Sequence, residues 1–430
     1  MRLLLFCTAV LLLPVFRAHS GCVAQDAPAF EVVSADGKPI RDITARSVAA
    51  DGIYFVRGKG EAQTLWWVGK DGAKPVTLAD GKTAVKDFEL WDFHAADTWY
   101  WPGQTLPGAW INLRTALGAS VYSLSGGIAK PVRLPDGGVL KDVRSKGASE
   151  FTCAVLLKDA NHEASVYRLK GDSAELVSIE PKFRRGAIKL VVAGECVVLH
   201  THELHAKDTD TRRLLVARND AFAPVNDSAG APMRYEPAAM DASMRFPVMR
   251  LEGDRLCVFG ESDKVVSLPP GTQARQAMLR EGVLYVDLQL SAARRRLMRL
   301  EGDELVEVRE EGATKRAEIS EALFVGDRML SCGSGKCWET LPDGKRRVFD
   351  LGEESGPWLQ QAAMGAANIV VGFLYMKPVV LELRSDTLEE LEVPLEPDAK
   401  NLLCAVSGEA VYVMQSSDKE NWWMLRRPLG

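Results

Sequence analysis

The sequence predicts an all-β fold built from repeated units, and three observations support this prediction. The eight residues 249–256 (MRLEGDRL) recur 49 positions later as residues 298–305 (MRLEGDEL). A second phrase at residues 119–126 (ASVYSLSG) recurs after 45 positions as residues 164–171 (ASVYRLKG). Short apolar, β-prone runs also follow small or acidic turns along the mature chain. Self-similarity with a period of roughly 20–50 residues is the signature of a repeat architecture.

Each repeat is expected to hold about four strands, a number typical of propeller blades. In residues 65–78, an apolar strand meets the turn Asp71-Gly72 and continues into a second strand. Residues 380–393 repeat this arrangement and show the alternation of a half-buried strand. Residues 358–367 have the composition of a short helical turn, but they lie where the other units have a strand.

Units of this length and content predict a single β-propeller over residues 25–430, with about eight four-stranded blades. The unit around Gly253 is out of step with the others. The last unit, residues 402–425, has three strands, and residues 30–33 supply a spare one. We expect this N-terminal strand to close the last blade, because pairing would remove an open sheet edge. The competing architectures are an open β-solenoid and two tandem sandwiches.

The first 24 residues predict a secretory signal peptide. Arg2 precedes a short apolar run over residues 3–16, and small residues follow this run, which is typical of such leaders. Cleavage is expected after Ala24 or after Ser20. Residues 20–22 also resemble the lipobox of bacterial lipoproteins, which would place a lipid on Cys22, although His19 departs from that pattern. The protein is therefore expected to be exported and to be periplasmic, on the cell surface or secreted, with no transmembrane segment after the leader.

Composition and charge limit the classes of partner. Of the 430 residues, 47% are hydrophobic, and the formal net charge is −5 at pH 7. This mildly acidic balance argues against non-specific nucleic-acid binding, which needs a positive face. The basic run at residues 294–296 is predicted to lie on a solvated strand edge. We therefore expect the partner to be a protein, peptide or glycan of the cell envelope, and not a nucleic acid.

Two cysteines are candidates for a disulfide. Cys332 and Cys337 flank a flexible turn between two short strands, and an exported protein can keep disulfides. Directly opposed strand residues are slightly too far apart for a bridge without local twist, so a reduced pair is the alternative. The other cysteines beyond the leader lie in apolar, strand-like runs and are predicted to be buried free thiols.

Three of the six histidines fall within six residues, at His200, His202 and His205. On a strand, His200 and His202 share a face and are candidates to hold one Zn²⁺ or Cu²⁺, with His205 joining after a bend. The alternative is a polar strand end that leads into a loop, because a short histidine-rich tract is only compositional evidence. A divalent metal at this tract is the single cofactor that the sequence suggests, and otherwise none is expected.

Aromatic residues gather in one part of the chain, because six of the ten tryptophans lie between residues 66 and 110. The segment 99–110 is aromatic and rich in turn residues, so Trp99, Trp101 and Trp110 are candidates for a platform that binds a glycan or peptide. The alternative is that these rings fill the wedge between neighbouring sheets. Sequence alone does not separate exposed from buried aromatic residues.

The layout resembles the wider β-propeller superfamily of exported bacterial proteins over nearly the whole mature chain. No blade motif recurs, since the dipeptide Trp91-Asp92 occurs once and lacks its Gly-His partner. The resemblance implies a fold and no particular activity. Without a nucleophile elbow or an assignable pair of carboxylates, we expect a non-enzymatic binding or scaffold protein. The alternative is a propeller glycoside hydrolase or polysaccharide lyase with its site at the channel mouth.

Overall fold

The computed structural model describes residues 29–429 with gaps, of which the longest are residues 86–92, 95–108, 204–212, 227–247 and 309–320. Every regular element in the described part of the chain is a β-strand, which confirms the predicted all-β class. Among these residues, none belongs to a helix that is long and apolar enough to cross a membrane.

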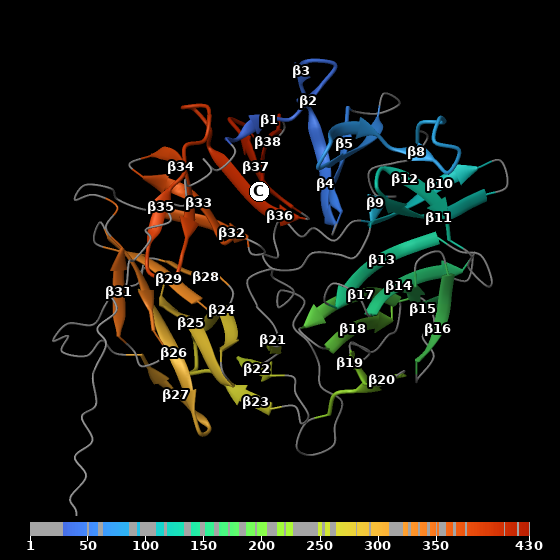
Figure 1. Ribbon diagram of the computed structural model, residues 1–430. Coiled ribbons are helices and arrows are strands. Elements are labelled where there is room, and N and C mark those ends of the chain that lie inside the picture. The colour runs from blue at the N-terminus through green and yellow to red at the C-terminus, as the bar shows by residue number, and fades with distance from the viewer. Residues whose placement is uncertain are drawn as a thin grey trace, which may run out of the picture.

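The sheets follow one another around a common centre in chain order (Figure 1). In the sheets that keep chain order, the first strand lies nearest the centre and the last strand lies toward the outside. The blue N-terminal strand and the red C-terminal sheet lie side by side. This arrangement is propeller-like, in agreement with the sequence.

The first two sheets differ in how the chain enters them. The first has the order β4-β5-β6-β7, with the bounds Ile43–Ala49, Gly52–Arg57, Thr64–Gly69 and Gly72–Pro75. The second has the order β8-β12-β11-β10-β9, with the bounds Thr77–Leu78, Ile128–Pro131, Gly118–Ser125, Ala109–Thr115 and Phe93–His94. Strand β8 runs parallel to β12 and is the edge strand of this sheet. The chain therefore forms the outer edge first and then continues with β9, the strand at the opposite edge.

The third sheet has eight strands and consists of two antiparallel meanders of four. One meander is β13 to β16, with the bounds Val139–Lys146, Phe151–Lys158, Glu163–Lys170 and Ser173–Ile179. The other is β17 to β20, with the bounds Gly186–Ala193, Cys196–Glu203, Arg213–Arg218 and Ala221–Pro224. They join where β16 runs parallel to β20.

The next four sheets are antiparallel and keep chain order. The three-stranded sheet β21 to β23 has the bounds Val248–Leu251, Arg255–Val258 and Lys264–Ser267. Sheet β24 to β27 has the bounds Gln273–Arg280, Val283–Ser291, Arg294–Glu301 and Glu304–Glu307. Sheet β28 to β31 has the bounds Glu321–Val325, Arg328–Gly333, Lys336–Thr340 and Arg346–Phe349. Sheet β32 to β35 has the bounds Trp358–Ala363, Ile369–Leu374, Lys377–Leu383 and Leu388–Glu390.

Two expectations from the sequence concern these sheets. Residues 358–367 have helix-like composition, but β32 (Trp358–Ala363) is a strand. The position of the segment within the repeat therefore predicted its structure better than its composition did. Residues 294–296 begin β26 and pair with β25, whereas the pairing of β26 with β27 covers residues 298–301. The strand edge expected at residues 294–296 therefore remains a prediction. Arg296 forms an ion pair with Glu307 of β27 at 3.3 Å.

The repeated phrase occupies two different places in its sheets. Its first copy spans β21 and β22, the first two strands of their sheet, whereas its second copy spans β26 and β27, the last two strands of theirs. The turn residues Asp254 and Gly302 both have left-handed backbone, with φ of 54° and 62°. The repeated phrase therefore encodes a hairpin of two strands and a tight turn, and it does not mark one fixed position within a sheet.

The last sheet brings the two ends of the chain together. Its order is β1-β38-β37-β36, with the bounds Glu31–Val32, Trp423–Pro428, Ala410–Ser416 and Asn401–Ser407. Glu31 pairs with Arg426, and Val32 pairs with Leu425, as expected for a spare strand at residues 30–33. The hairpin of β2 (Ser34–Ala35) and β3 (Lys38–Pro39) then leads toward β4.

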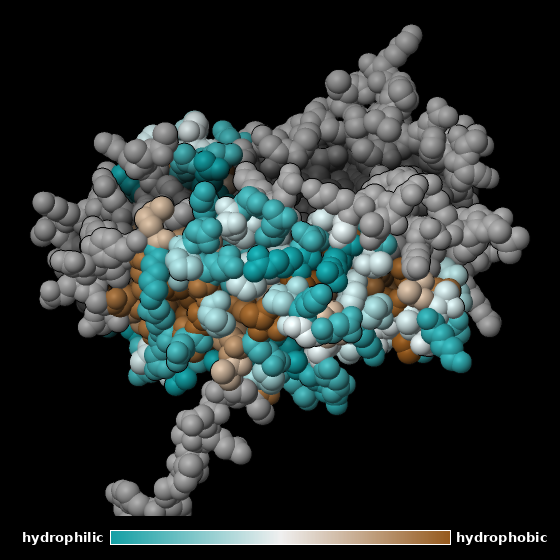
Figure 2. Space-filling model, turned by 90° about the horizontal axis from the view of Figure 1, so that it is seen from above, coloured by the Kyte–Doolittle hydropathy of each residue, from teal (hydrophilic) through white to brown (hydrophobic). Residues whose placement is uncertain are grey.

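The hydrophobic core is divided among the spaces between consecutive sheets. Tyr54 packs with Ile111 of the second sheet, whereas its neighbour Phe55 packs with Tyr412 of the last sheet. Strand β5 is thus buried on both faces, which explains why its sequence is an unbroken apolar run. At the surface, Figure 2 shows hydrophobic residues gathered in a band between hydrophilic ones.

Candidate functional site

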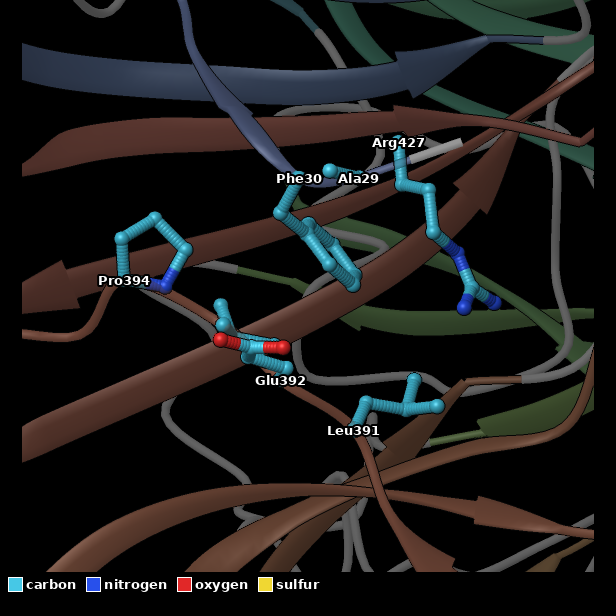
Figure 3. Close-up of a pocket in the computed structure, with 7 residues that line it drawn as sticks. Ala29, Phe30, Leu391, Glu392, Pro394 and Arg427 are labelled. Carbon is cyan, nitrogen blue, oxygen red and sulfur yellow. The ribbon is translucent and has the colours of Figure 1, made fainter. Parts of the chain in front are cut away.

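A cavity of about 500 Å³ lies where the last sheet meets the segment that follows β35. Its walls come from both ends of the chain and from this segment, and they are formed by Ala29, Phe30, Leu391, Glu392, Val393, Pro394 and Arg427 (Figure 3). Five of these seven side chains are apolar. Since β1 is the edge strand of its sheet, the cavity belongs to the outer rim of the molecule rather than to its centre.

Alternation along the segment after β35 places its apolar side chains inward. Leu391 and Val393 are half-buried and pack against the core cluster beneath, whereas Glu392 and Pro394 are exposed. The backbone is held by a hydrogen bond from the Leu391 N–H to the Val380 carbonyl at 2.8 Å. The segment thus keeps the period of a strand beyond the end of β35.

Arg427 supplies the charge of the cavity. It lies on β38 opposite Val411, and its side chain is only 9% exposed. Its guanidinium carbon lies 5.2 Å from the centre of the Phe30 ring. Its one ion pair joins Nη2 to Glu382 at 3.7 Å among the described residues, which is beyond hydrogen-bond distance.

The lining residues combine apolar walls with two ionisable side chains. Of the seven, Glu392 and Arg427 carry ionisable side chains, and no serine, threonine, cysteine or histidine is among them. Phe30 is 8% exposed, so its ring is a fixed wall. An apolar cleft with a few polar groups is the usual composition of a small-molecule site.

A second cluster places arginines on aromatic rings between the last and first sheets. Arg46, Phe55 and Trp66 stand directly opposite one another across β4, β5 and β6. The Phe55 and Trp66 rings stack with centroids 6.4 Å apart, and Arg46 lies 4.6 Å from the ring centre of Trp422. Because Trp66 and Trp422 pack against the core between these sheets, the arginines cover the end of an apolar core.

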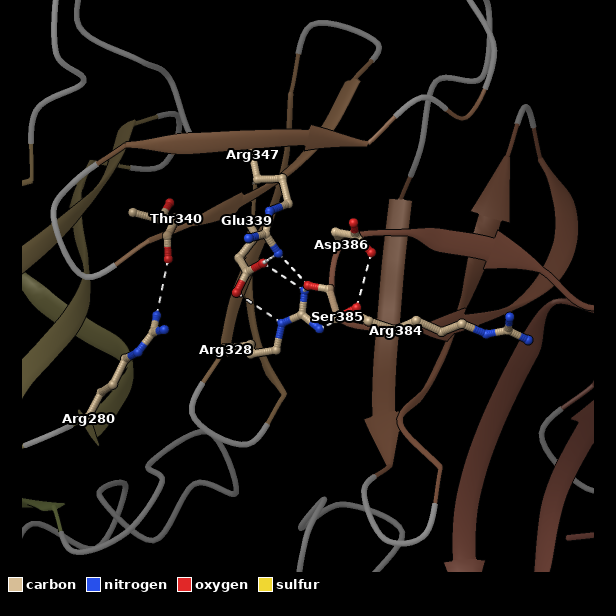
Figure 4. A network of polar contacts seen from close by, with 8 residues as sticks. All are labelled: Arg280, Arg328, Glu339, Thr340, Arg347, Arg384, Ser385 and Asp386. Carbon is tan, nitrogen blue, oxygen red and sulfur yellow. Dashed lines mark hydrogen bonds and ion pairs between the residues drawn. The ribbon is translucent and has the colours of Figure 1, made fainter. Parts of the chain in front are cut away.

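A polar network joins two further sheets (Figure 4). Arg328 donates hydrogen bonds to Glu339 at 2.9 and 2.7 Å, and its Nη2 donates to the Ser385 carbonyl of the next sheet at 3.2 Å. Arg347 donates to the same Glu339 carboxylate at 3.4 Å and also to the Ser385 carbonyl. Ser385 lies in the turn between β34 and β35, so the network connects one sheet to the outer turn of its neighbour.

The same kind of bridge recurs at other sheet junctions. Arg280 donates to the Thr340 carbonyl at 3.3 Å, and Lys264 donates to the Gly302 carbonyl at 2.6 Å. In each case, a side chain reaches a backbone group at or beside the turn between the last two strands of the next sheet. Such contacts position sheets, and we assign these bridges to the scaffold.

Tyr54 and Asp51 form a bridge of this kind between the first and second sheets. The Tyr54 hydroxyl donates to Asp51 at 2.9 Å, and the Gly126 N–H donates to the same carboxylate at 2.5 Å. Burial, followed by the negative charge of Asp51, raises the pKa of Tyr54 far above its ordinary value. The second oxygen of Asp51 is buried with no hydrogen-bond partner among the described residues.

The predicted tryptophan platform and metal site lie mainly outside the described residues. Trp99, Trp101 and His205 are in segments that the structure does not describe. Trp110 lies on β10, opposite Ser123 and His94, while His200 and His202 lie on β18. In the described part of the chain, no three His, Cys, Asp or Glu side chains gather as metal ligands, and both sites remain predictions.

Cys332 and Cys337 stand directly opposite each other on β29 and β30. Both thiols are buried and are not joined in a disulfide, and their sulfur atoms lie 3.3 Å apart. The hydrogen bond with Cys332, followed by burial, raises the pKa of the Cys337 thiol far above its ordinary value. The structure therefore places the two cysteines as neighbours, and the disulfide remains a prediction.

The comparisons with known proteins show no sequence family. No protein-family model matches the sequence, and no curated protein matches it. A structure from a study of two prolyl endopeptidases has a TM-score of 0.41 and 11% identity, covering 88% of this chain and 55% of that one. The β-propeller domain of the Trilobed protease from Pyrococcus furiosus has a TM-score of 0.39 and 7% identity, covering 83% and 97%.

Dipeptidyl peptidase 4 from Porphyromonas gingivalis has a TM-score of 0.37 and 10% identity, covering 87% of this chain and 56% of that one. This chain thus spans 55% and 56% of the lengths of the two longer peptidases. With identities and TM-scores this low, the likeness carries no argument about activity. The chain is all-β with several antiparallel sheets of four or five strands, and its structural neighbours are propeller-like.

Proposed function

We propose that this chain is a non-enzymatic binding or scaffold propeller of the cell envelope, which contacts a protein, peptide or glycan. The observation that carries the proposal is the rim cavity, because it combines about 500 Å³ of space with apolar walls and two ionisable side chains. This composition is that of a recognition site. The fold by itself supports no particular function.

The proposal includes the architecture and the location. We propose about eight four-stranded blades over residues 25–430, closed by the pairing of β1 with β38, with the three-stranded sheet β21 to β23 as an additional short unit. We further propose that residues 1–24 direct export, with a lipid on Cys22 if the cleavage precedes that residue. The mass of the mature N-terminal peptide from fractionated cells tests both statements about export.

Site-specific photo-crosslinking in cells tests the binding function. A crosslinking amino acid at Val393 lies on the cavity wall, and the same amino acid at Val348, which is 56% exposed on β31, is the matched control. We expect a defined adduct from position 393 and none from position 348, and its mass spectrum identifies a protein, peptide or glycan. Equal labelling at both positions, or no adduct from either, overturns the proposal.

Two further experiments test the sites that the sequence predicts. Loss of glycan binding in the double variant Trp99→Ala/Trp101→Ala supports the platform, and unchanged binding contradicts it. Elemental analysis of the purified protein, with His202→Ala as the comparison, tests for a metal at His200, His202 and His205. Release of reducing sugar ends from an envelope polysaccharide would overturn the non-enzymatic proposal in favour of a glycoside hydrolase.

A further inference from the structure

We infer that the rim cavity binds a short apolar peptide with free termini, holding its carboxylate at Arg427 and its apolar side chains against Phe30, Leu391 and Val393. The peptide's ammonium group then faces Glu392. This inference rests on the proposed binding function and names the class of ligand. It follows from three properties of the cavity: an accessible guanidinium without a hydrogen-bond acceptor among the described residues, an apolar wall, and charges of opposite sign on that wall.

Among the described residues, the guanidinium of Arg427 has no hydrogen-bond acceptor. It carries five N–H donors, its side chain is 9% exposed, and Glu382 at 3.7 Å is its one charged contact among the described residues. Glu382 also accepts a hydrogen bond from Arg384 at 3.1 Å, so its charge is shared. None of its nitrogen atoms is among the fully buried polar atoms without a partner, so the guanidinium stays accessible to a ligand. A carboxylate satisfies a guanidinium with two parallel hydrogen bonds.

The apolar wall orients this guanidinium and offers contact to an apolar ligand. The Phe30 ring lies 5.2 Å from the guanidinium carbon, a distance typical of a cation–π contact. Leu391 and Val393 are half-buried, so each keeps part of its surface available. Covering this surface with a ligand removes apolar area from water, which favours binding.

The charges on the wall match the two ends of a peptide. Figure 3 shows Phe30 between the side chains of Arg427 and Glu392, and Glu392 is exposed. A carboxylate ligand without an ammonium group would leave Glu392 without a partner on the ligand, whereas a free peptide complements both charges. The volume of about 500 Å³ is that of a typical small-ligand site, and a peptide of a few residues fits this range.

Calorimetric titration of the full mature chain with trileucine tests the inference. Its C-terminal amide and its N-acetyl derivative are the two comparison ligands. We expect trileucine to bind, and we expect the amide to bind about tenfold or more weakly, because it loses the charge-assisted hydrogen bonds. The N-acetyl derivative is expected to lose about two- to fivefold, since Glu392 is exposed and its ion pair is weak.

Variants assign the effect to the cavity. Arg427→Gln is expected to bind trileucine and its amide equally, because the variant has no guanidinium to distinguish them. Lys377→Gln, which removes a 72% exposed cation of the neighbouring sheet, is expected to bind as the wild type does. If Arg427→Gln fails to fold by circular dichroism, the acid–amide comparison on the wild-type protein still decides.

The results separate failure of this inference from failure of the proposed function. The inference is overturned if trileucine does not bind, if acid and amide bind equally to the wild type, or if Arg427→Gln still distinguishes them. Equal binding of the N-acetyl derivative overturns the role of Glu392. A specific adduct at Val393 together with any of these results leaves the proposed binding function standing and removes the peptide as its ligand.

Discussion

Arg328 forms two hydrogen bonds with Glu339, at 2.9 and 2.7 Å, and the Glu339 side chain is only 3% exposed. The pair lies where one sheet meets the next, since Arg328 also donates to the backbone carbonyl of Ser385. Buried ion pairs add little net stability when both partners are compared with apolar residues, but removal of one partner leaves an uncompensated charge. This asymmetry makes the pair a sensitive test of how the sheets are held together.

Replacing Glu339 with Ala is expected to lower the free energy of unfolding by about 3 kcal/mol, because it leaves the charge of Arg328 without its buried partner. Urea denaturation followed by circular dichroism measures the change. Glu390→Ala is the matched control, because Glu390 is 47% exposed and pairs with the exposed Lys377. The control is expected to lose about 0.5 kcal/mol or less, and equal losses in the two variants would contradict the structural role.

Alkaline pH is expected to destabilise the fold through Tyr54. The pKa of this residue is raised in the folded state, first by burial and then by Asp51. Its contribution to stability is therefore complete below the unfolded pKa of about 10 and falls as the pH rises above it. Once the unfolded chain ionises, the expected slope is about 1.4 kcal/mol per pH unit for this single group.

The variant Tyr54→Phe removes this titration. It is expected to lose about 1 kcal/mol at pH 8, because the hydrogen bond to Asp51 is gone. Its stability should then fall less steeply than that of the wild type above pH 10. Denaturation curves at pH 8, 10 and 11 give both quantities, with Tyr122→Phe as the control, and parallel curves for wild type and Tyr54→Phe would disprove the assignment.

Gly52 is expected to tolerate no side chain. Its φ is 145°, and a Cβ atom there would contact the Val68 carbonyl oxygen and lie 2.8 Å from Trp67 Nε1. Gly52→Ala should therefore destabilise the protein by about 3 kcal/mol or more through steric overlap and backbone strain. Gly81→Ala is the matched control, because φ is also positive at 69° but nothing lies within 4 Å, and a loss of about 1 kcal/mol is expected.

Oxidation of Cys332 and Cys337 is expected to depend on the state of the chain. In the folded, reduced protein the pKa of the Cys337 thiol is raised and both thiols are buried, so the thiolate needed for exchange is scarce. Refolding in an oxidised glutathione buffer should join the pair, whose sulfur atoms lie 3.3 Å apart when reduced. Alkylation without reductant, followed by peptide mass analysis, detects the bond, and full alkylation of both cysteines after refolding would argue against it.

Patterns along the chain predicted the strands and one distant pairing, that of residues 30–33 with the last unit, but not the side-chain contacts between distant segments. The spare strand at residues 30–33 and the incomplete last unit were visible in the sequence because strand number is a local property. The cavity needed Phe30, Leu391 and Arg427 to meet, and nothing local to any one of these residues indicates its neighbours.

The candidate site shows the same limit more strongly. Three tryptophans and three histidines were selected by composition, whereas no local pattern selected the residues that line the rim cavity. The residue that gives the cavity its charge, Arg427, has no motif around it. Its significance comes from its place beside Phe30 and from the lack of a hydrogen-bond acceptor among the described residues, and both depend on packing between distant segments.

The pairing of Glu31 with Arg426 has a consequence for the order of folding. Their side chains also form an ion pair at 3.2 Å across a sequence separation of 395 residues. Contacts this distant close a very long loop, and such contacts slow folding because their entropy must be lost before they form. During synthesis β1 emerges from the ribosome early, but its partner β38 is made near the end of the chain. Strand β1 is therefore among the last elements to reach its native position.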